Sequence, residues 1–328
     1  MIKYYFNDER GLIKEIPEFR KGCWIDVFDN PQDNEMDEII RLSGLPEEML
    51  KAPLDEEESV RCEMDDGNNL YIFDIPVIES DDGGALFYTT LPIGILFNEN
   101  CIVTICLKKN VVLKDFARGR VKGIDTEKPI NFILNFLYCN SQKFLSYLKQ
   151  LEKSSKRVQN ELNKSMKNKE LIDLLDIEKS LVYFSTSLSS NQRLIDRMEK
   201  INQIRQNEDY QDLYEDVVIE SRQAMEMCST YRDILNGTMD AFASVISNNL
   251  NVVMKLLTII TIVLSVPTLI FSLFGMNVRL PFAGNKYGFY IIIGIALVLA
   301  GVISYLLIIN TKNEGRKEKI RKSKRKKD

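Results

Sequence analysis

The 328 residues contain no histidine, and none of the six cysteines stands in a Cys-X-X-Cys pair. Without histidine the commonest general base and transition-metal ligand is missing, and Ser–His and Cys–His catalysis are excluded. The scattered thiols lack the spacing of a structural zinc site. We therefore expect no enzyme activity and no zinc site, and we expect the cysteines to be reduced thiols.

Glycine and proline are scarce between residues 129 and 250, where only Pro129 and Gly237 occur. Both residues break helices, so their scarcity predicts long helices in this region. We expect one unbroken helix to begin near Asp209 and to continue into the apolar segment that follows. Gly237 is expected to be a position of close packing.

The first 125 residues combine short β-like runs with turn-forming sequences, which predicts an α/β domain with its own core. The expected elements are strands at 24–28, 70–77, 91–97 and 101–107, a helix at 34–43 that ends near Gly44, and turns at 30–31, 65–68 and 81–84.

Two uncharged runs follow the helical region, nineteen residues at 256–274 and twenty-three at 287–309. At about 1.5 Å per residue, each is long enough to cross a hydrocarbon core of about 30 Å. The sequence therefore predicts two membrane-spanning helices.

The first of these helices has a polar stripe, because its polar residues and one methionine recur at steps of three and four. The stripe consists of Asn251, Met254, Thr258, Thr261, Ser265, Thr268 and Ser272. Polar groups in hydrocarbon need partners, so the stripe is either a helix–helix seam of small residues or the wall of a pore in a homo-oligomer. Serine and threonine can also bond back to their own helix, and Pro267 inside the segment leaves one helical carbonyl without its usual partner.

Charge sets the expected topology. Residues 311–328 contain ten Lys/Arg and three Asp/Glu directly after the second run, so the positive-inside rule places this tail in the cytoplasm. Two spans return the chain to its starting side, so the N-terminal part is expected there too, in agreement with the charges that interrupt any apolar leader at the N-terminus. Anionic lipid head groups, rather than nucleic acid, are the expected partner of the tail.

The end of the first apolar run carries a recognisable signature. Phe274-Gly275-Met276-Asn277 resembles the Gly-Met-Asn motif that closes the first membrane helix of the CorA family of divalent-metal channels. Residues 231–234 and 251–258 resemble the stalk and pore helix of that family, and Trp24-Ile25-Asp26 with Pro92-Ile93-Gly94 resemble its N-terminal domain. The resemblance covers nearly the whole chain and is densest at 228–277.

This resemblance implies a CorA-like funnel, a homopentamer in the cell membrane with both termini in the cytoplasm. It implies Mg²⁺ transport that cytoplasmic Mg²⁺ gates, with Mg²⁺ as both cargo and regulator and no organic cofactor. The expected parts of each subunit are a cytoplasmic α/β domain at 1–125, a helical stalk at 126–250, a pore helix at 251–277, an extracytoplasmic loop at 278–286, a second transmembrane helix at 287–309 and a basic cytoplasmic tail at 310–328.

The resemblance also implies roles for individual residues. The pore entrance and wall would comprise Gly275, Met276, Asn277, Thr268, Ser265, Thr261 and Thr258; the gate would comprise Met254 and Leu257, with Asn251 at its cytoplasmic end. Asp216 would bind regulatory Mg²⁺ between subunits, with Asp81 or Asp82 of a neighbour as candidate partners. Mg²⁺ sheds water reluctantly, and the neutral Asn277 amide can accept hydrogen bonds from its hydration shell.

Three features depart from the family pattern. Ser265 occupies a position that is apolar in some relatives, Phe274 replaces the commoner tyrosine, and the loop after Asn277 lacks an acidic cluster. Two alternatives stay open: transport of Zn²⁺, Co²⁺ or Ni²⁺ by the same fold, and a membrane-tethered coiled-coil scaffold without permeation. The scaffold gives no reason for Asn277 or for a polar face through the bilayer.

Overall fold

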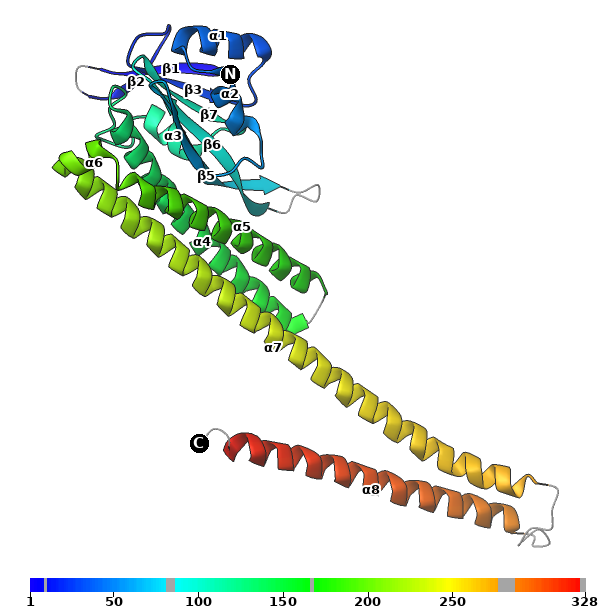
Figure 1. The fold of residues 1–328 in the computed structure, drawn as a ribbon. Helices are drawn as coiled ribbons and strands as arrows, with labels where there is room; N and C mark the ends of the chain where they lie inside the picture. The colour runs from blue at the N-terminus through cyan, green and yellow to red at the C-terminus, as the bar shows by residue number, and fades with distance from the viewer. Residues whose placement is uncertain (9–10, 81–85, 166–167, 277–286, 325–328) are drawn as a thin grey trace. The chain divides into compact units, whose positions relative to one another are not determined.

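A computed structural model describes the chain except residues 9–10, 81–85, 166–167, 277–286 and 325–328, and it describes no side chains at 80, 86, 163–168 and 310–324. The chain divides into two compact units, Met1–Thr238 and Met239–Asp328, and each is described by itself. The first unit contains a mixed sheet with strand order β2-β1-β3-β7-β6-β5-β4 (Figure 1).

The strands are β1 Ile2–Asn7, β2 Ile13–Ile16, β3 Cys23–Phe28, β4 Arg61–Asp65, β5 Asn68–Ser80, β6 Leu86–Phe97 and β7 Cys101–Cys106. The helices are α1 Asp33–Ser43, α2 Glu47–Lys51, the 3₁₀ helix η1 Ala52–Leu54, α3 Val111–Ala117, α4 Pro129–Ser165, α5 Asn168–Met198, α6 Asn202–Gln206, α7 Glu208–Phe274 and α8 Gly288–Lys324. The parallel pair is β3 with β7, and the other neighbouring strands are antiparallel.

The four expected strands and the helix at 34–43 are confirmed as β3, β5, β6, β7 and α1. Gly44 ends α1 in the left-handed conformation with φ of 72°, as a C-terminal glycine does. The turn at 65–68 joins β4 to β5, whereas the one at 81–84 lies outside the described residues. The sequence analysis missed β1, β2 and β4, which are only partly buried.

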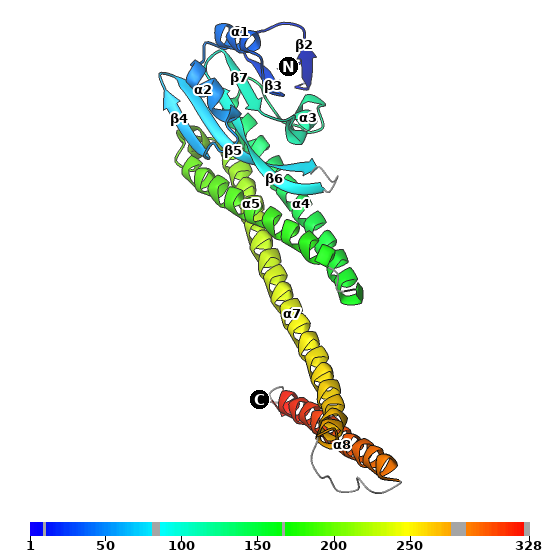
Figure 2. The same cartoon turned by 90° about the vertical axis from the view of Figure 1, so that its right-hand side faces the viewer.

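The sheet separates two apolar cores. Figures 1 and 2 show α4, α5 and the beginning of α7 on one side of the sheet and α1 with α2 on the other. Trp24 and Phe73 belong to the core on the side of α4 and α5, and Ile25 and Leu50 to the core on the side of α1 and α2. The domain is therefore a three-layer α/β/α arrangement.

A buried polar chain joins the two parallel strands. The Trp24 indole N–H donates to the Thr104 hydroxyl at 2.8 Å, and that hydroxyl donates to the Asp26 carboxylate at 2.9 Å. Burial raises the pKa of Asp26 to about 6, because a low-dielectric site disfavours the charged form. The hydrogen bonds compensate part of the cost of burying these groups and pair β3 with β7 in one register.

The helical hairpin of α4 and α5 satisfies an open strand edge. Pairing of β4 with β5 ends at Ile72, so the backbone of Asp74 has no partner strand on that side. The Asp74 N–H donates to the Asn191 side-chain oxygen at 2.9 Å, and the Asn191 and Asn140 amides donate to the Asp74 carbonyl at 2.8 and 3.0 Å. Two asparagines thus replace a β-strand at this edge and fix the hairpin against the sheet.

One glycine is required by a close contact. A Cβ added at Gly94 in β6 would lie 2.1 Å from Cγ of Pro53, in the η1 turn. The ring of Pro53 therefore packs directly on the backbone of the sheet, and only glycine leaves room for it.

The expected unbroken helix is confirmed, because α7 runs for 67 residues from Glu208 to Phe274 and contains Pro267. The expectation of close packing at Gly237 is wrong for the single chain, because a Cβ added there would meet no described atom within 4 Å beyond its chain neighbours and the backbone of its own helix. Gly237 lies on an open helix surface, where glycine lowers helix stability relative to alanine.

These two glycines predict opposite effects of the same substitution. We expect Gly94→Ala to lower the free energy of unfolding by about 1–3 kcal/mol, because it overpacks the contact with Pro53. Gly237→Ala is expected to raise it by up to about 1 kcal/mol, because alanine favours the helix. Thermal unfolding followed by the fluorescence of Trp24, the single tryptophan, measures both. Equal stability of the two variants would contradict the packing argument.

Candidate ion pathway

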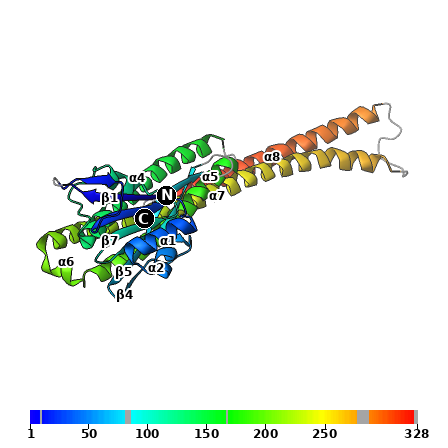
Figure 3. The ribbon, with the colours of Figure 1, turned by 90° about the horizontal axis from the view of Figure 1, so that it is seen from above.

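The second unit contains the two apolar helices that the sequence predicts. The final part of α7 and residues Gly288–Ile309 of α8 are long and apolar enough to cross a membrane. Figure 3 shows that α8 runs back in the opposite sense to the end of α7. The expected second span, 287–309, matches this part of α8 to within one residue.

The polar stripe of α7 is exposed along its length, but its hydroxyl protons are already used. Each of the four central hydroxyls donates to a backbone carbonyl of its own helix at 2.8–2.9 Å. The donors and acceptors are Thr258 to Met254, Thr261 to Leu257, Ser265 to Ile262 and Thr268 to Leu264. What these side chains present outward is therefore the oxygen lone pairs, which can only accept hydrogen bonds.

The least exposed residues of this part of α7 also follow helical spacing. They are Ile259, Val263, Val266, Pro267, Ile270 and Phe274, all half-buried. At 100° per residue, their mean direction is about 170° away from that of the five hydroxyl residues of the stripe. Since α8 is the other described helix of this unit and buries Ala296 and Ala300, we infer that α8 covers the face of α7 opposite the stripe.

The face that remains open has a shallow depression. Its lining residues are Thr261, Leu264, Ser265, Thr268, Leu269 and Ser272, all from α7. A face with four hydroxyl residues along a membrane helix is costly to leave against lipid, because lipid supplies no hydrogen bonds.

The three residues of the expected gate lie at the start of the apolar stretch and are also exposed. Met254 and Leu257 have exposed fractions of 58% and 56%, and Asn251 is exposed one turn earlier. In a single chain they touch no opposing surface that would close a pore. Their role as a constriction therefore depends on further copies of α7.

The signature at the end of α7 is described only in part. The helix ends at Phe274, and the Gly275 N–H donates to the carbonyls of Phe271 and Ser272, which closes the last turn. Met276 is 57% exposed. Asn277 lies outside the described residues.

Asp216 lies on α7 in the first unit, exposed, one turn before Glu220. Burial is the main cause that raises the pKa of the Tyr138 hydroxyl, and the negative charges of Glu220 and Asp216 raise it further. The described residues contain no cluster of three or more Asp, Glu, Cys or His side chains that could hold a metal ion. Asp81 and Asp82, the candidate partners of Asp216 on a neighbouring subunit, lie outside the described residues.

The sequence analysis missed how the two faces of α7 are divided. The signal was present, because Ile259, Val263, Val266, Ile270 and Phe274 recur at steps of four and three, as packed residues do. It was hidden because the other apolar positions of the segment are equally hydrophobic.

An α/β domain followed by one very long helix and two apolar helices defines a membrane protein with a large soluble part. The family profile described as "CorA-like Mg2+ transporter protein" matches residues 20–316. The chain belongs to the CorA family, whose members are membrane transporters of divalent cations.

Individual relatives agree with this assignment. The chain is 30% identical over 297 residues to the cobalt/magnesium transport protein CorA of Methanocaldococcus jannaschii, covering 86% of this chain and 89% of that one. The complete structure of the CorA magnesium transporter from the same organism has a TM-score of 0.80 at 24% identity and covers 93% and 96% of the two chains. The ZntB cytoplasmic domain of Vibrio parahaemolyticus shares the fold more distantly, with a TM-score of 0.56 at 11% identity over 75% of this chain and 98% of that domain.

The division of faces predicts which helix meets water. Single cysteines at Thr261, Ser265 and Thr268, in a cysteine-free background, should react with a small water-soluble thiol reagent, because their face is polar and open. Cysteines at Ile292 and Leu299 of α8 should react far more slowly, because α8 carries no comparable polar face. The measurement is the rate of modification in reconstituted protein, and equal rates on both helices would contradict the assignment of α7 to the pore.

Proposed function

We propose that this chain is one subunit of a homopentameric channel that conducts Mg²⁺ across the cell membrane, with both termini in the cytoplasm. The observation that carries this proposal is the uncovered polar face of α7, opposite the face that α8 covers. A ring of such helices satisfies the polar face with water and with each other, whereas a monomer leaves it against lipid. The basic tail after α8 would lie at anionic lipid head groups.

The chemistry of the stripe suits a hydrated cation. The water shell of a cation points its hydrogens outward, and the hydroxyls of Thr258, Thr261, Ser265 and Thr268 present acceptors because their own protons are committed to the helix. Mg²⁺ keeps its water and prefers oxygen ligands, so it can pass such a wall without being dehydrated. The neutral amide of Asn277 would make the same kind of contact at the entrance.

The side chains of the stripe also allow a comparison with the alternative functions, transport of another metal ion or a scaffold without permeation. Zn²⁺ and Ni²⁺ favour nitrogen and sulfur ligands, which the stripe lacks apart from Met254. Co²⁺ is a second candidate cargo, since the relative from Methanocaldococcus jannaschii is named for cobalt and magnesium. A scaffold without permeation would give no reason for the open polar face of α7.

Gating would couple two distant sites on α7, the constriction at Met254 and Leu257 and the ion site at Asp216. Met254 and Leu257 from five subunits would form apolar rings that exclude ions by making a narrow pore unfavourable for water. Asp216 would share cytoplasmic Mg²⁺ with a neighbouring subunit and so report the internal concentration. Such coupling requires two states that differ in affinity for the ion.

The entrance is tested by Asn277→Ala. We expect this variant to assemble as the wild type does and to lose Mg²⁺ flux, because the amide oxygen that would accept hydrogen bonds from the hydrated ion is gone. Flux into proteoliposomes is compared for Mg²⁺, Co²⁺ and Zn²⁺, with assembly checked by size-exclusion chromatography. Normal Mg²⁺ flux through a correctly assembled variant would refute the entrance assignment.

The sensor is tested by two substitutions at one site. Asp216→Lys places a fixed positive charge where the ion would bind, so the variant should be resistant to limited proteolysis even without Mg²⁺. Asp216→Ala should weaken the dependence of proteolysis on Mg²⁺. The measurement is limited proteolysis over a Mg²⁺ titration; identical curves for wild type and both variants would remove Asp216 from the sensor.

A further inference from the structure

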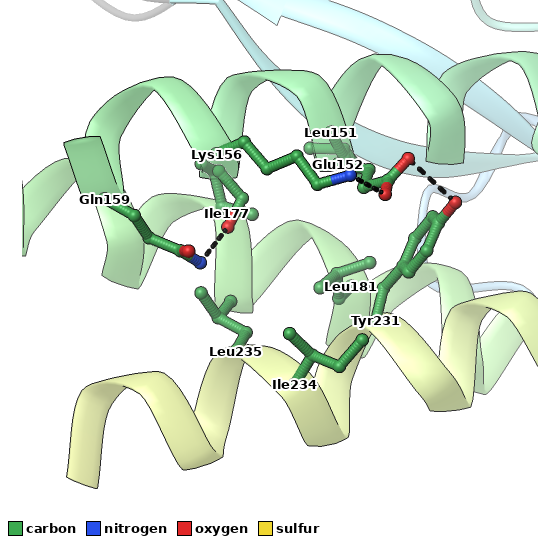
Figure 4. A pocket seen from close by; sticks show the side chains of 10 residues that line it. Leu151, Glu152, Lys156, Gln159, Ile177, Leu181, Tyr231, Ile234 and Leu235 are labelled. Carbon is green, nitrogen blue, oxygen red and sulfur yellow. Dashed lines mark hydrogen bonds and ion pairs between the residues drawn. The ribbon is translucent and has the colours of Figure 1, made fainter. Parts of the chain in front are cut away.

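In the first unit, α4, α5 and α7 enclose a small cavity shortly before Thr238 (Figure 4). Its walls are mostly aliphatic and include Leu151, Ile234 and Leu235, and its polar rim includes Glu152, Lys156 and Tyr231. The volume is about 70 Å³, far below the ~300–1,000 Å³ of a site for a drug-sized ligand. The space is therefore room for side chains to rearrange rather than a binding pocket.

A charge-assisted hydrogen bond crosses the rim of this cavity. The Tyr231 hydroxyl of α7 donates to Oε2 of Glu152 on α4 at 3.0 Å, and Lys156 donates to the other oxygen, Oε1 (Figure 4). The hydrogen bonds from Lys156 and Tyr231 lower the pKa of Glu152, and burial with the nearby carboxylate raises the pKa of Tyr231. At neutral pH the pair is a charged acceptor and a neutral donor, the stronger kind of hydrogen bond.

The other polar contacts of this stretch of α7 reach α5 instead. The Cys228 thiol lies 3.4 Å from the Leu181 carbonyl, and the Arg232 guanidinium lies 3.5 Å from the Ser185 hydroxyl. Tyr231, between them, hydrogen-bonds to α4 through Glu152. Sliding or rotation of α7 against the hairpin would break this bond, because a hydrogen bond weakens steeply once its geometry is lost.

The bond lies close to the end of the part of α7 that belongs to the first unit. Leu235, one turn after Tyr231, is 1% exposed, whereas Ile234 beside it is 57% exposed and borders the cavity. Two residues further on, a Cβ added at Gly237 would meet nothing within 4 Å in the described part of the chain, apart from its neighbours and the backbone of its own helix. Met254 lies on the same continuous helix, 23 residues after Tyr231.

We propose that Tyr231 and Glu152 are positioning residues that hold α7 against the helical hairpin near the end of the first unit, and that their hydrogen bond sets the Mg²⁺ concentration at which the channel closes. This proposal rests on the channel function proposed above. The bond holds α7 in its packed, ordered position, which belongs to the closed arrangement that bound Mg²⁺ favours. The adjacent cavity lets Ile234 and Leu235 shift when the bond opens.

The test measures Mg²⁺ flux in proteoliposomes as a function of internal Mg²⁺, for the full chain and its variants. Tyr231→Phe and Glu152→Ala should each raise the internal Mg²⁺ for half-maximal closure by about fivefold or more, the scale of one lost hydrogen bond. The double variant should shift it no further than the larger single shift, because both changes break the same bond.

Two matched controls separate positioning from mere loss of a contact. Tyr214→Phe removes another hydroxyl donor of α7, which contacts the Ile195 carbonyl of α5 at 3.1 Å. Lys156→Met removes the ion pair and leaves the Tyr231–Glu152 bond. Both should stay within about twofold of wild type, a difference smaller than one hydrogen bond contributes. If Tyr231→Phe shifts closure no more than Tyr214→Phe does, the proposal is overturned.

A second measurement keeps the proposal distinguishable from the channel function. Hydrogen–deuterium exchange should show faster exchange at 226–236 of α7 in Tyr231→Phe than in wild type, with 210–218 unchanged. If the wild type conducts no Mg²⁺, the channel function fails while exchange still decides the positioning role. Unchanged exchange at 226–236 overturns that role, and Trp24 fluorescence confirms that the variant is folded.

Discussion

A polar face on a membrane helix has to be covered by something that can hydrogen-bond, since hydrocarbon offers no partner. In this chain α8 does not provide that cover, because it lies on the opposite side of α7. Backbone carbonyls of α7 accept hydrogen bonds from its own threonine and serine hydroxyls, so the donors of these side chains are satisfied within the helix. The outward oxygens still need donors, and water inside a ring of subunits is the simplest supply. The proposed assembly and conduction would thus answer the same requirement that the sequence of α7 creates.

The long helix was predictable because its evidence is local. Between Glu208 and Phe274 the chain has one glycine and one proline, and α7 forms over the whole stretch. The central strands were predictable for the same reason, as short apolar runs between turns. The edge strands β2 and β4 were not, because their residues are polar and partly exposed, and their pairing depends on distant segments.

The other features that the sequence did not predict depend on contacts between residues far apart in the chain. Gly94 is required by a proline forty-one residues earlier, and Asn191 satisfies a strand edge more than one hundred residues before it. Neither relation has a signal in a single sequence. The stripe of α7 could be predicted from spacing alone, but the position of α8 could not, because the apolar part of α8, Gly288–Ile309, has no comparable polar face. The regulatory role of Asp216 and the gate at Met254 need a second chain, so they stay predictions.

The uninterrupted length of α7 has an electrostatic consequence. Aligned peptide dipoles give a helix a partial charge of about −0.5 at its C-terminal end. That end lies at Phe274 and Gly275, next to the Gly-Met-Asn segment. Five such ends in a ring would place about −2.5 charges around the pore entrance without a single carboxylate. The loop that follows has no acidic residue, so the backbone itself would attract cations to the entrance.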